Sequence, residues 1–246
     1  MKEKILILGH KGLLGNMVYL YFKSKKYEIV TTTLRWPNDN FKSFVINEKP
    51  DVIINCIGII PQRKPEEKLY DIVNYQLPMW LDSLNIKIIH PDTDEDDSTT
   101  YGLFKKMARE GVKNNTKILK TSIMGFENGT KFSLLEWFLN SEGEINGFTN
   151  QFWNGNTTLE WAKWSEKLII RWNFYKNIIT LENPECLSKY KILLTIKNIF
   201  NKDINIIPTR SNLSKNNCMV GDYKTKDLVL QIIEMKSFYE KNKKLL

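Results

Sequence analysis

Tyr101 and Lys105 are the pair of residues in this 246-residue chain whose chemistry is easiest to name. They stand four positions apart, so on a helix their side chains lie on one face. A free tyrosine has a pKa of about 10, but a neighbouring ammonium group stabilises the phenolate and lowers that pKa. The pair is therefore suited to donating a proton to a carbonyl oxygen while the carbonyl is reduced. The spacing is common, however, and the alternative is a tyrosine that caps a helix beside a surface lysine.

A second chemical signal is the glycine-rich turn near the N-terminus. The apolar run Ile5 to Leu8 is typical of a buried strand, and glycines follow at positions 9, 12 and 15 before an amphipathic segment. Glycine lets backbone amides approach a pyrophosphate, and the N-terminal N–H groups of the next helix point at that anion. We predict that a dinucleotide contacts Gly9, His10, Lys11, Gly12, Leu13, Leu14 and Gly15. The alternative is a tight turn without a ligand.

Two further segments bear on the cofactor. Arg35 follows the second expected strand, where an acidic residue would bind ribose hydroxyls and an arginine suits a 2′-phosphate. Arg35, together with Lys11, therefore predicts NADP(H) rather than NAD(H), unless both are ordinary surface cations. At the end of the third expected strand, the cofactor is predicted to lie against Asn55, Cys56, Ile57 and Gly58.

The hydrophobic pattern predicts the elements that must position these residues. Strands are expected at 5–8, 27–33, 51–56, 86–89, 117–121, 178–181 and 204–207. Helices are expected at 14–23, 41–48, 66–84 with an interruption at Pro78, 101–112, 133–140, 158–172, 188–200 and 226–239. The alternation predicts an α/β fold with a Rossmann-type, doubly wound parallel sheet. Residues 1–125 would form the dinucleotide-binding domain, its sheet completed by segments from 150–185, and residues 126–246 mainly a small C-terminal substrate lobe interleaved with it.

Composition limits the classes of partner. Lys and Arg outnumber Asp and Glu by 36 to 28, which favours anionic partners. The lysines are scattered except in the tail 236–244, which we interpret as a solvated helix end, so no nucleic acid is expected. No apolar run approaches the roughly 20 residues of a membrane span and no signal-peptide pattern opens the chain, so we expect a cytoplasmic protein without membrane contact. Cys56, Cys186 and Cys218 are odd in number and widely spaced, which predicts neither a disulfide nor a metal site.

Five segments of the first half carry a resemblance: Gly9–Gly15, Asp51–Gly58, Asn74–Pro78, Tyr101–Lys105 and Thr121–Gly125. They resemble the extended short-chain dehydrogenase/reductase superfamily and, within it, the dTDP-4-dehydrorhamnose reductase-like proteins. Segments 133–139, 147–155 and 157–160 are similar to a subgroup that reduces UDP-activated 4-keto-6-deoxy amino sugars. The resemblance implies an NADP-dependent oxidoreductase of a nucleotide-sugar C4 keto group in deoxysugar biosynthesis. It also implies that Tyr101 donates the proton and that Lys105 holds the nicotinamide ribose.

The chain departs from that family after the fourth expected strand. The family carries a Ser-Thr-Asp segment there, whose hydroxyl binds the substrate carbonyl, whereas here only Pro91 to Thr100 precede the tyrosine. Thr93, which precedes Asp94, is the candidate for this role, and Ser98, Thr99 or Thr100 are alternatives. If none serves, the chain would be a weak or inactive subunit that binds a dinucleotide or nucleotide sugar. A third class, a scaffold or nucleic-acid protein that uses the basic surface, predicts no affinity for NADPH.

The second half is rich in aromatic residues, at positions 137, 148, 152, 153 and 161. Such rings stack on nucleobases, although packing in the core is the alternative for each of them. We predict that Phe152, Trp153 and Asn154 face the substrate, with Ser122 as a further contact. A homodimer is the oligomeric state under consideration.

Overall fold

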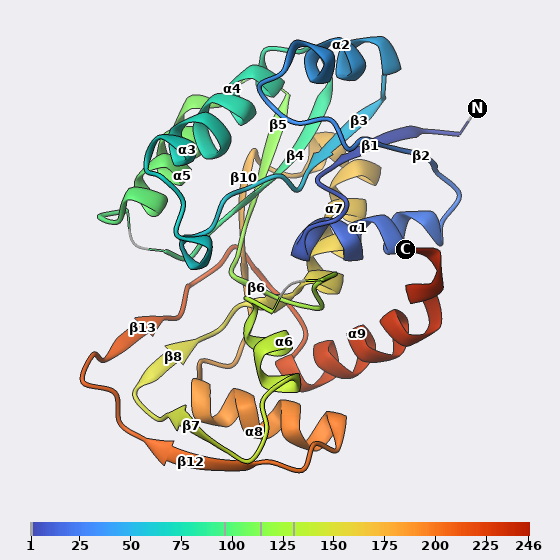
Figure 1. Ribbon diagram of the computed structural model, residues 1–246. Helices are drawn as coiled ribbons and strands as arrows, with labels where there is room; N and C mark the ends of the chain where they lie inside the picture. Colours follow the sequence, from blue (N-terminus) through green and yellow to red (C-terminus); the bar gives the residue numbers. More distant parts are fainter. Residues whose placement is uncertain (1, 96, 114, 130) are drawn as a thin grey trace.

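The structure is a computed structural model that describes residues 2–95, 97–113, 115–129 and 131–246. Asp96, in the expected acidic loop, lies outside these ranges. The described residues form a seven-stranded sheet in the order β14-β10-β5-β4-β3-β1-β2, and all of its described pairings are parallel (Figure 1). Helices cover both faces of this sheet, and a smaller lobe lies beyond its carboxyl end. The predicted α/β fold with a Rossmann-type parallel sheet is confirmed.

The bounds of the elements are as follows. The central sheet contains β1 (Lys4–Leu8), β2 (Glu28–Thr31), β3 (Val52–Asn55), β4 (Lys87–Asp92), β5 (Thr116–Lys120), β10 (Ile178–Glu182) and β14 (Tyr223–Lys224). Its helices are α1 (Leu13–Lys23), α2 (Asp39–Glu48), α3 (Lys68–Tyr70), the π-helical η2 (Asp71–Gln76), α4 (Leu77–Asp82), α5 (Thr100–Gly111), α7 (Thr158–Ile170) and α9 (Leu228–Asn242). The smaller lobe contains β6 (Ile123–Met124), α6 (Leu134–Leu139), β7 (Glu144–Phe148), β8 (Gln151–Trp153), β9 (Asn156–Thr157), β11 (Leu187–Ser188), α8 (Lys189–Phe200), β12 (Asn205–Thr209) and β13 (Lys215–Asn217). Short 3₁₀ turns are η1 (Pro61–Arg63), η3 (Trp172–Phe174) and η4 (Lys243–Leu245).

Strand β1 shows how the sheet separates two cores. Its side chains alternate between the two faces, as in any strand. Ile5 and Ile7 belong to the core that contains α1, α7, α8 and α9, whereas Leu6 and Leu8 pack with α2 and α4. Burying each such side chain contributes about 1.5–3 kcal/mol, so this central strand is fixed firmly in register.

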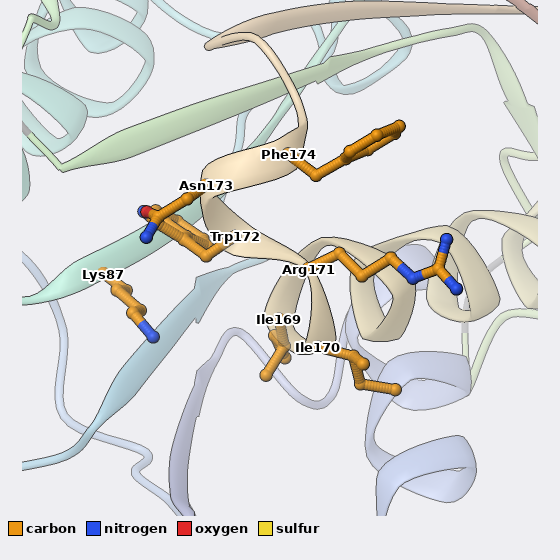
Figure 2. Close-up of a pocket in the computed structure, with 7 residues that line it drawn as sticks. All are labelled: Lys87, Ile169, Ile170, Arg171, Trp172, Asn173 and Phe174. Atoms are coloured by element: carbon orange, nitrogen blue, oxygen red, sulfur yellow. The ribbon is translucent and has the colours of Figure 1, made fainter.

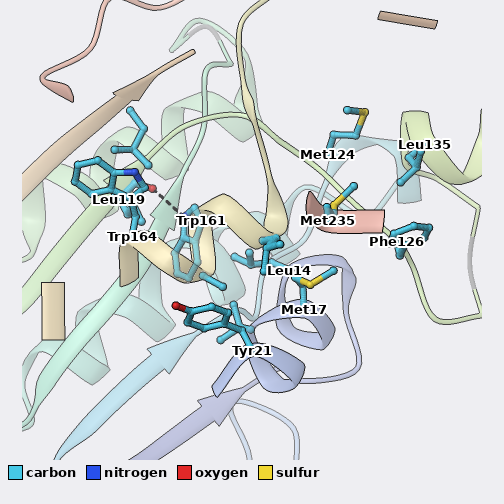
Figure 3. Packing of buried hydrophobic residues seen from close by; sticks show 14 of the residues in the cluster. Leu14, Met17, Tyr21, Leu119, Met124, Phe126, Leu135, Trp161, Trp164 and Met235 are labelled. Carbon is cyan, nitrogen blue, oxygen red and sulfur yellow. Dashed lines mark hydrogen bonds between the residues drawn. The ribbon is translucent and has the colours of Figure 1, made fainter. Parts of the chain in front are cut away.

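Helices from the two halves of the sequence pack directly on each other. Helix α1 contacts α7, and the fully buried Trp161 of α7 lies in the same core as Met17 of α1 (Figure 3). The indole Nε1 of Trp161 donates to the carbonyl oxygen of Leu119 at 3.4 Å, which ties α7 to β5. Trp161 is thus a core residue rather than a ligand contact.

Strand β4 is longer than the sequence predicts, because it continues through Pro91 to Asp92. Proline has no N–H for a strand ladder and is tolerated where one edge is unpaired. Here β3 pairs with β4 only as far as Ile89, so Pro91 needs a partner on the β5 side alone. The extension places Thr93 immediately after the strand.

Two other expectations were wrong. Pro78 does not end the helical segment, because the π-helical η2 passes directly into α4 at Leu77 and the proline occupies the first turn of α4. Loops were expected between 141 and 157, but the chain forms the short strands β7, β8 and β9 there. These strands pair with β12, with β11 and β13, and with β6, respectively, and such distant partners cannot be read from a local pattern.

The sheet topology defines where a ligand would bind. Strand β1 lies between β2 and β3, so the chain leaves β1 to one side first and then crosses to the other. Ligands of open α/β sheets bind outside the carboxyl ends of the strands at such a switch point. The glycine turn after β1 and the segment after β3 both lie there. No helix in the described part of the chain is long and apolar enough to cross a membrane.

Candidate functional site

Glycine stands at each of the three positions of the turn after β1 for a different structural reason. Gly9 has a φ of 76°, a conformation that side chains rarely adopt, and a Cβ there would lie 2.9 Å from the backbone of Cys56. A Cβ on Gly15 would lie 2.0 Å from the Gly9 oxygen, so this glycine lets α1 pack on the turn. A Cβ on Gly12 would meet only the Gly9 oxygen, at 3.4 Å. Packing therefore does not require glycine at position 12, which is where backbone would approach a pyrophosphate.

The N-terminus of α1 adjoins this turn. Gly12 is the N-cap and offers no side-chain hydrogen bond, so the first N–H groups of the helix remain for an anion. His10 is half-buried, and its buried Nδ1 has no hydrogen-bond partner among the described residues. Burial lowers the pKa of His10, and the charge of Lys11 lowers it further. Lys11 is exposed and Leu13 half-exposed, whereas Leu14 is buried in the core, so only its backbone can face a cofactor.

The segment after β3 lies beside the turn. The Cys56 N–H donates to the Leu8 oxygen at 2.9 Å, and the Asn55 side chain accepts from the Ile57 N–H at 3.0 Å. The Asn55 amide also lies 3.0 Å from Nδ1 of the buried His90 on β4. Burial raises the pKa of the Cys56 thiol, which makes it an inert thiol rather than a nucleophile. Gly58 is exposed at the edge of this segment.

Arg35 lies four residues beyond the end of β2 and is exposed. Its backbone oxygen accepts a hydrogen bond from the Asn38 N–H at 3.1 Å. Its guanidinium makes no hydrogen bond or ion pair with another described residue, so it is available to an anion at the carboxyl end of the sheet. The contact of Arg35 with a 2′-phosphate stays a prediction.

The structure brings Thr93 and Tyr101 together. Thr93 follows the last residue of β4, Tyr101 lies in the first turn of α5, and their side chains are hydrogen-bonded to each other. The phenol of Tyr101 also packs against the ring of Tyr70, with 5.9 Å between the ring centroids. Two hydroxyl groups therefore lie side by side at the carboxyl end of the sheet. Such a pair can bind one carbonyl oxygen between them.

The alternative hydroxyls have other functions. Thr99 is the N-cap of α5 and accepts a hydrogen bond from the Gly102 N–H at 3.0 Å. Thr100 donates to Glu67 at 2.9 Å, and Ser98 is exposed. The Thr93 hydroxyl likewise accepts from the Glu95 N–H at 3.2 Å, and Thr93 is favoured because its side chain is hydrogen-bonded to Tyr101.

One electrostatic expectation was wrong. Lys105 was expected to lower the pKa of Tyr101, but burial and the carboxylates of Asp92, Asp94 and Glu95 raise it, against the hydrogen bond from Thr93. The Lys105 ammonium instead donates to the Pro91 oxygen at 2.8 Å. Lys105 is buried, and burial lowers its own pKa to about 8, against the opposing effect of Asp92. The raised pKa keeps the proton on Tyr101 and makes the phenol a weaker acid than the expected pair with Lys105 would be.

The candidate substrate residues do not all face the crevice. Asn154 is buried and its amide is fully used, since it donates to the Met219 oxygen at 2.7 Å and accepts from the Met219 N–H at 2.8 Å. The prediction that Asn154 faces a ligand is therefore wrong, and its function is to join two loops. The ring of Trp153 packs over Gly155, whereas Phe152 is 38% exposed. Ser122 is half-buried between β5 and β6, and its carbonyl accepts from the Asn156 N–H at 2.8 Å.

Several residues near the site were not predicted. Arg109 of α5 donates to Asp92 at 2.5 Å. From the smaller lobe, Asn217 donates to Asp94 at 3.1 Å and Lys215 to Glu95 at 3.0 Å. The alternation of polar residues 90 and 92 on one side of an apolar strand is the local signal that could have indicated the first pair. No local signal indicates the contacts from the smaller lobe.

The cysteine prediction also needs correction, because Cys186 and Cys218 form a disulfide. They are 32 positions apart, and their meeting depends on how the loop before β11 lies beside β13. Cys56 stays a free thiol. Within the described ranges, no group of three or more His, Cys, Asp and Glu side chains is arranged to hold a metal ion.

A cavity of about 510 Å³ lies elsewhere, between Lys87 at the start of β4 and the segment Ile169–Phe174 (Figure 2). The side chains of Arg171 and Phe174 extend away from Lys87 rather than converging on it. Because this cavity is at the amino end of the parallel strands, it is not the crevice in which α/β sheets bind ligands. The candidate site is therefore assigned to the carboxyl end of the sheet, where the glycine turn, Thr93 and Tyr101 lie.

Comparison with family models and with curated proteins finds no match. Solved structures do match. A dTDP-4-dehydrorhamnose reductase from Clostridium acetobutylicum is 21% identical with a TM-score of 0.77, covering 96% of this chain and 99% of that one. The enzyme of the same name from Bacillus anthracis, in complex with NADP, is 16% identical with a TM-score of 0.82, covering 96% and 98%. A GDP-mannoheptose C4 reductase from Campylobacter jejuni with NADP bound is 15% identical with a TM-score of 0.74, covering 97% and 98%. The chain therefore has the fold of dTDP-4-dehydrorhamnose reductases and related nucleotide-sugar reductases.

Proposed function

We propose that the protein is an NADP-dependent oxidoreductase that reduces the keto group of a nucleotide-activated sugar. The observation that carries this proposal is the hydrogen-bonded pair Thr93 and Tyr101 at the carboxyl end of the sheet, the same end that carries the glycine turn suited to a dinucleotide. Solved structures with the same fold include reductases with NADP bound. The buried Lys105 lies four residues after Tyr101 on α5 and donates to the Pro91 oxygen, two residues before Thr93.

The chain's own residues fit the cofactor. The pyrophosphate would lie over Gly12 and the first N–H groups of α1. Neighbouring atoms leave room for a side chain at Gly12, so packing does not explain why this residue is glycine. The exposed Arg35 would bind the 2′-phosphate, and Asn55 to Gly58 would line the crevice. When bound, NADPH supplies a hydride to the carbonyl carbon.

The proton comes from the protein. Thr93 and Tyr101 would hold the carbonyl oxygen, and the Tyr101 phenol would give its proton to that oxygen as it becomes a hydroxyl. The resulting phenolate takes a proton back from solvent. Lys105, when charged, favours that phenolate and would hold the nicotinamide ribose, so both residues act on the same step.

The finer assignment is a 4-keto-6-deoxyhexose reduced at C4 and linked to UDP, including 2-acetamido sugars. It is supported by the likeness of segments 133–139, 147–155 and 157–160 to the UDP-sugar subgroup. The enzymes of the solved structures named above are named for dTDP- and GDP-linked sugars. A test must therefore offer sugars linked to UDP, to dTDP and to GDP. Phe152, Trp153 and Ser122 are the proposed substrate contacts. A cytoplasmic location and a homodimer stay predictions.

The enzyme assignment is tested by NADPH oxidation with UDP-, dTDP- and GDP-linked 4-keto sugars. Tyr101→Phe should reduce kcat about 10²- to 10⁴-fold, because the proton donor is lost, while the Kd for NADPH changes little. Tyr239→Phe, on α9, is the matched control. NADPH binding without oxidation of any of these sugars would favour a binding subunit instead, and wild-type turnover by Tyr101→Phe would contradict the proton-donor role.

The cofactor site is tested by comparing two glycines. Gly12→Ala should fold normally but raise the Kd for NADPH at least tenfold, because its new methyl group occupies the place of a phosphate oxygen. Gly15→Ala should instead cost roughly 1–3 kcal/mol of stability, since its Cβ overlaps the Gly9 oxygen. Calorimetric titration and urea unfolding separate the two effects. Unchanged affinity in Gly12→Ala would place the dinucleotide elsewhere.

A further inference from the structure

The short segment between β4 and α5 is rich in acidic residues, and the described carboxylates each have a partner. Asp92 accepts from Arg109 at 2.5 Å, and Asp97 lies 3.5 Å from the same guanidinium. Asp94 accepts from Asn217, and Glu95 pairs with Lys215. This segment joins the two hydroxyl groups of the candidate site, since Thr93 lies at its start and Tyr101 follows its end.

Arg109 lies on the face of α5 that carries the candidate chemistry. Tyr101, Lys105 and Arg109 are spaced four apart, so they line one side of the helix. The Arg109 side chain is 13% exposed and the Asp92 side chain 2% exposed, so the pair is shielded from solvent. A planar guanidinium can bind two carboxylates at once, which a lysine ammonium does less well.

The two carboxylates flank Thr93 in the sequence. Asp92 is the last residue of β4, directly before Thr93, and Asp97 lies between Thr93 and Tyr101. One cation on α5 therefore connects the end of the strand, the connecting segment and the helix that carries the phenol. Removing it would leave the buried Asp92 carboxylate without its hydrogen-bonded cation, with the Lys105 ammonium as a remaining nearby charge, and its Oδ1 already has no partner among the described residues.

We propose that Arg109 is a positioning residue, which holds the Thr93 hydroxyl against the Tyr101 phenol by bridging Asp92 and Asp97. Its importance for turnover rests on the proposed reductase function. The bridge itself does not depend on that function, because it concerns only the contacts of Arg109 with Asp92 and Asp97. Lys105 also joins α5 to β4 through the Pro91 oxygen, but Arg109 contacts both the end of the strand and the connecting segment through Asp92 and Asp97.

The test compares Arg109→Ala with Lys106→Ala, a matched control on the same helix. Lys106 is 3.6 Å from Asp97, but the side chains of Lys106 and Asp97 are 40% and 42% exposed, so this pair should matter little. Arg109→Ala should lower kcat about 10- to 100-fold and leave KM and the Kd for NADPH within a fewfold of wild type, because misplaced reacting groups slow the chemical step. Arg109→Lys should give an intermediate kcat. Lys106→Ala should match wild type.

Hydrogen exchange gives a readout that needs no turnover. Peptides covering 93–101 should exchange faster in Arg109→Ala than in wild type or Lys106→Ala, while peptides from β1 and α1 stay unchanged. If wild type shows no turnover, the proposed function fails. Hydrogen exchange alone then tests whether Arg109 holds the segment between β4 and α5. Unchanged exchange in 93–101, or wild-type kcat in an active Arg109 variant, would overturn the inference. If Arg109→Ala does not fold, kcat and hydrogen exchange of Arg109→Lys test the inference in its place.

Discussion

At the scale of single residues, Lys105 is a lysine whose ammonium is buried. Its ammonium is buried on α5, donates to the Pro91 oxygen and is close enough to Asp92 for that carboxylate to favour the charged form. Burial nevertheless prevails and lowers its pKa to about 8. A lysine with such a pKa is partly neutral just above physiological pH, so its charge depends on pH where that of an ordinary lysine does not.

This shift makes stability depend on pH in a defined direction. Between about pH 8 and 10.5 the unfolded chain holds the Lys105 proton and the folded chain does not, so stability rises with pH. Below about pH 8 the cost of burying the charge is fully present. The unfolding free energy of wild type minus that of Lys105→Met should therefore rise by about 2 kcal/mol from pH 7.5 to 9.5. Urea unfolding at both pH values measures it.

The matched control for this measurement is Lys106→Met, whose side chain is 40% exposed in the wild-type protein. The unfolding free energy of wild type minus that of Lys106→Met should be the same at pH 7.5 and pH 9.5. If the difference in unfolding free energy between wild type and Lys105→Met does not change with pH, then the Lys105 ammonium of wild type has an ordinary pKa and burial does not control its charge.

At the scale of elements, the smaller lobe contacts the candidate site through β13. Asn217 on that strand donates to Asp94, and the next residue, Cys218, is bound to Cys186 before β11. Strand β8 lies between β11 and β13 and pairs with both. The disulfide therefore links the end of β13 to the chain before β11. Side chains of β13 contact Asp94 and Glu95, which follow Thr93.

We expect the disulfide to stabilise the folded protein. Cross-linking two positions that are 32 residues apart restricts the unfolded chain, so Cys186→Ser/Cys218→Ser should lower the free energy of unfolding by roughly 2–4 kcal/mol. Urea unfolding with and without dithiothreitol measures this. The reductant should destabilise wild type and leave the double variant unchanged. Titration of three free thiols in unreduced, unfolded wild type would show that the disulfide does not form.

At the scale of the whole molecule, the two halves of the sequence build one sheet and one main core. Strands β10 and β14 come from the second half, and α7 and α9 share a core with α1. The sheet and this core therefore cross the expected division at residue 125, which stays a prediction for where the cofactor and the substrate bind. The smaller lobe and the sheet are therefore expected to unfold together.

A fragment of residues 1–125 tests this. It lacks β10, which pairs with β5, and α7, which covers α1, so β5 would be an open edge and much of the core would be exposed. We expect the fragment to show no cooperative thermal transition by circular dichroism, whereas the full chain shows one. A fragment with a sharp transition and protected amides in β1 would show that the first half folds independently.

Local patterns determined the parts of the protein whose physics is local. The strand, glycine turn and helix at residues 5–23 could be predicted because an apolar run, glycine spacing and helical periodicity each act within a few residues. The same holds for Tyr101 and Lys105 on one helix face, and the alternation of strands and helices was enough to predict the parallel sheet.

Tertiary structure alone decided what depends on distant partners. The hydrogen bond from Thr93, the burial that raises the pKa of Tyr101, the bridge from Arg109 and the cystine of the smaller lobe all join groups whose meeting depends on the packed fold. Asn154 has the composition of a ligand contact but is used entirely by Met219 and Asn183. The physical reason is that pKa values, ion pairs and cross-links depend on distances in space, and a sequence pattern fixes those distances only within a single helix, strand or turn.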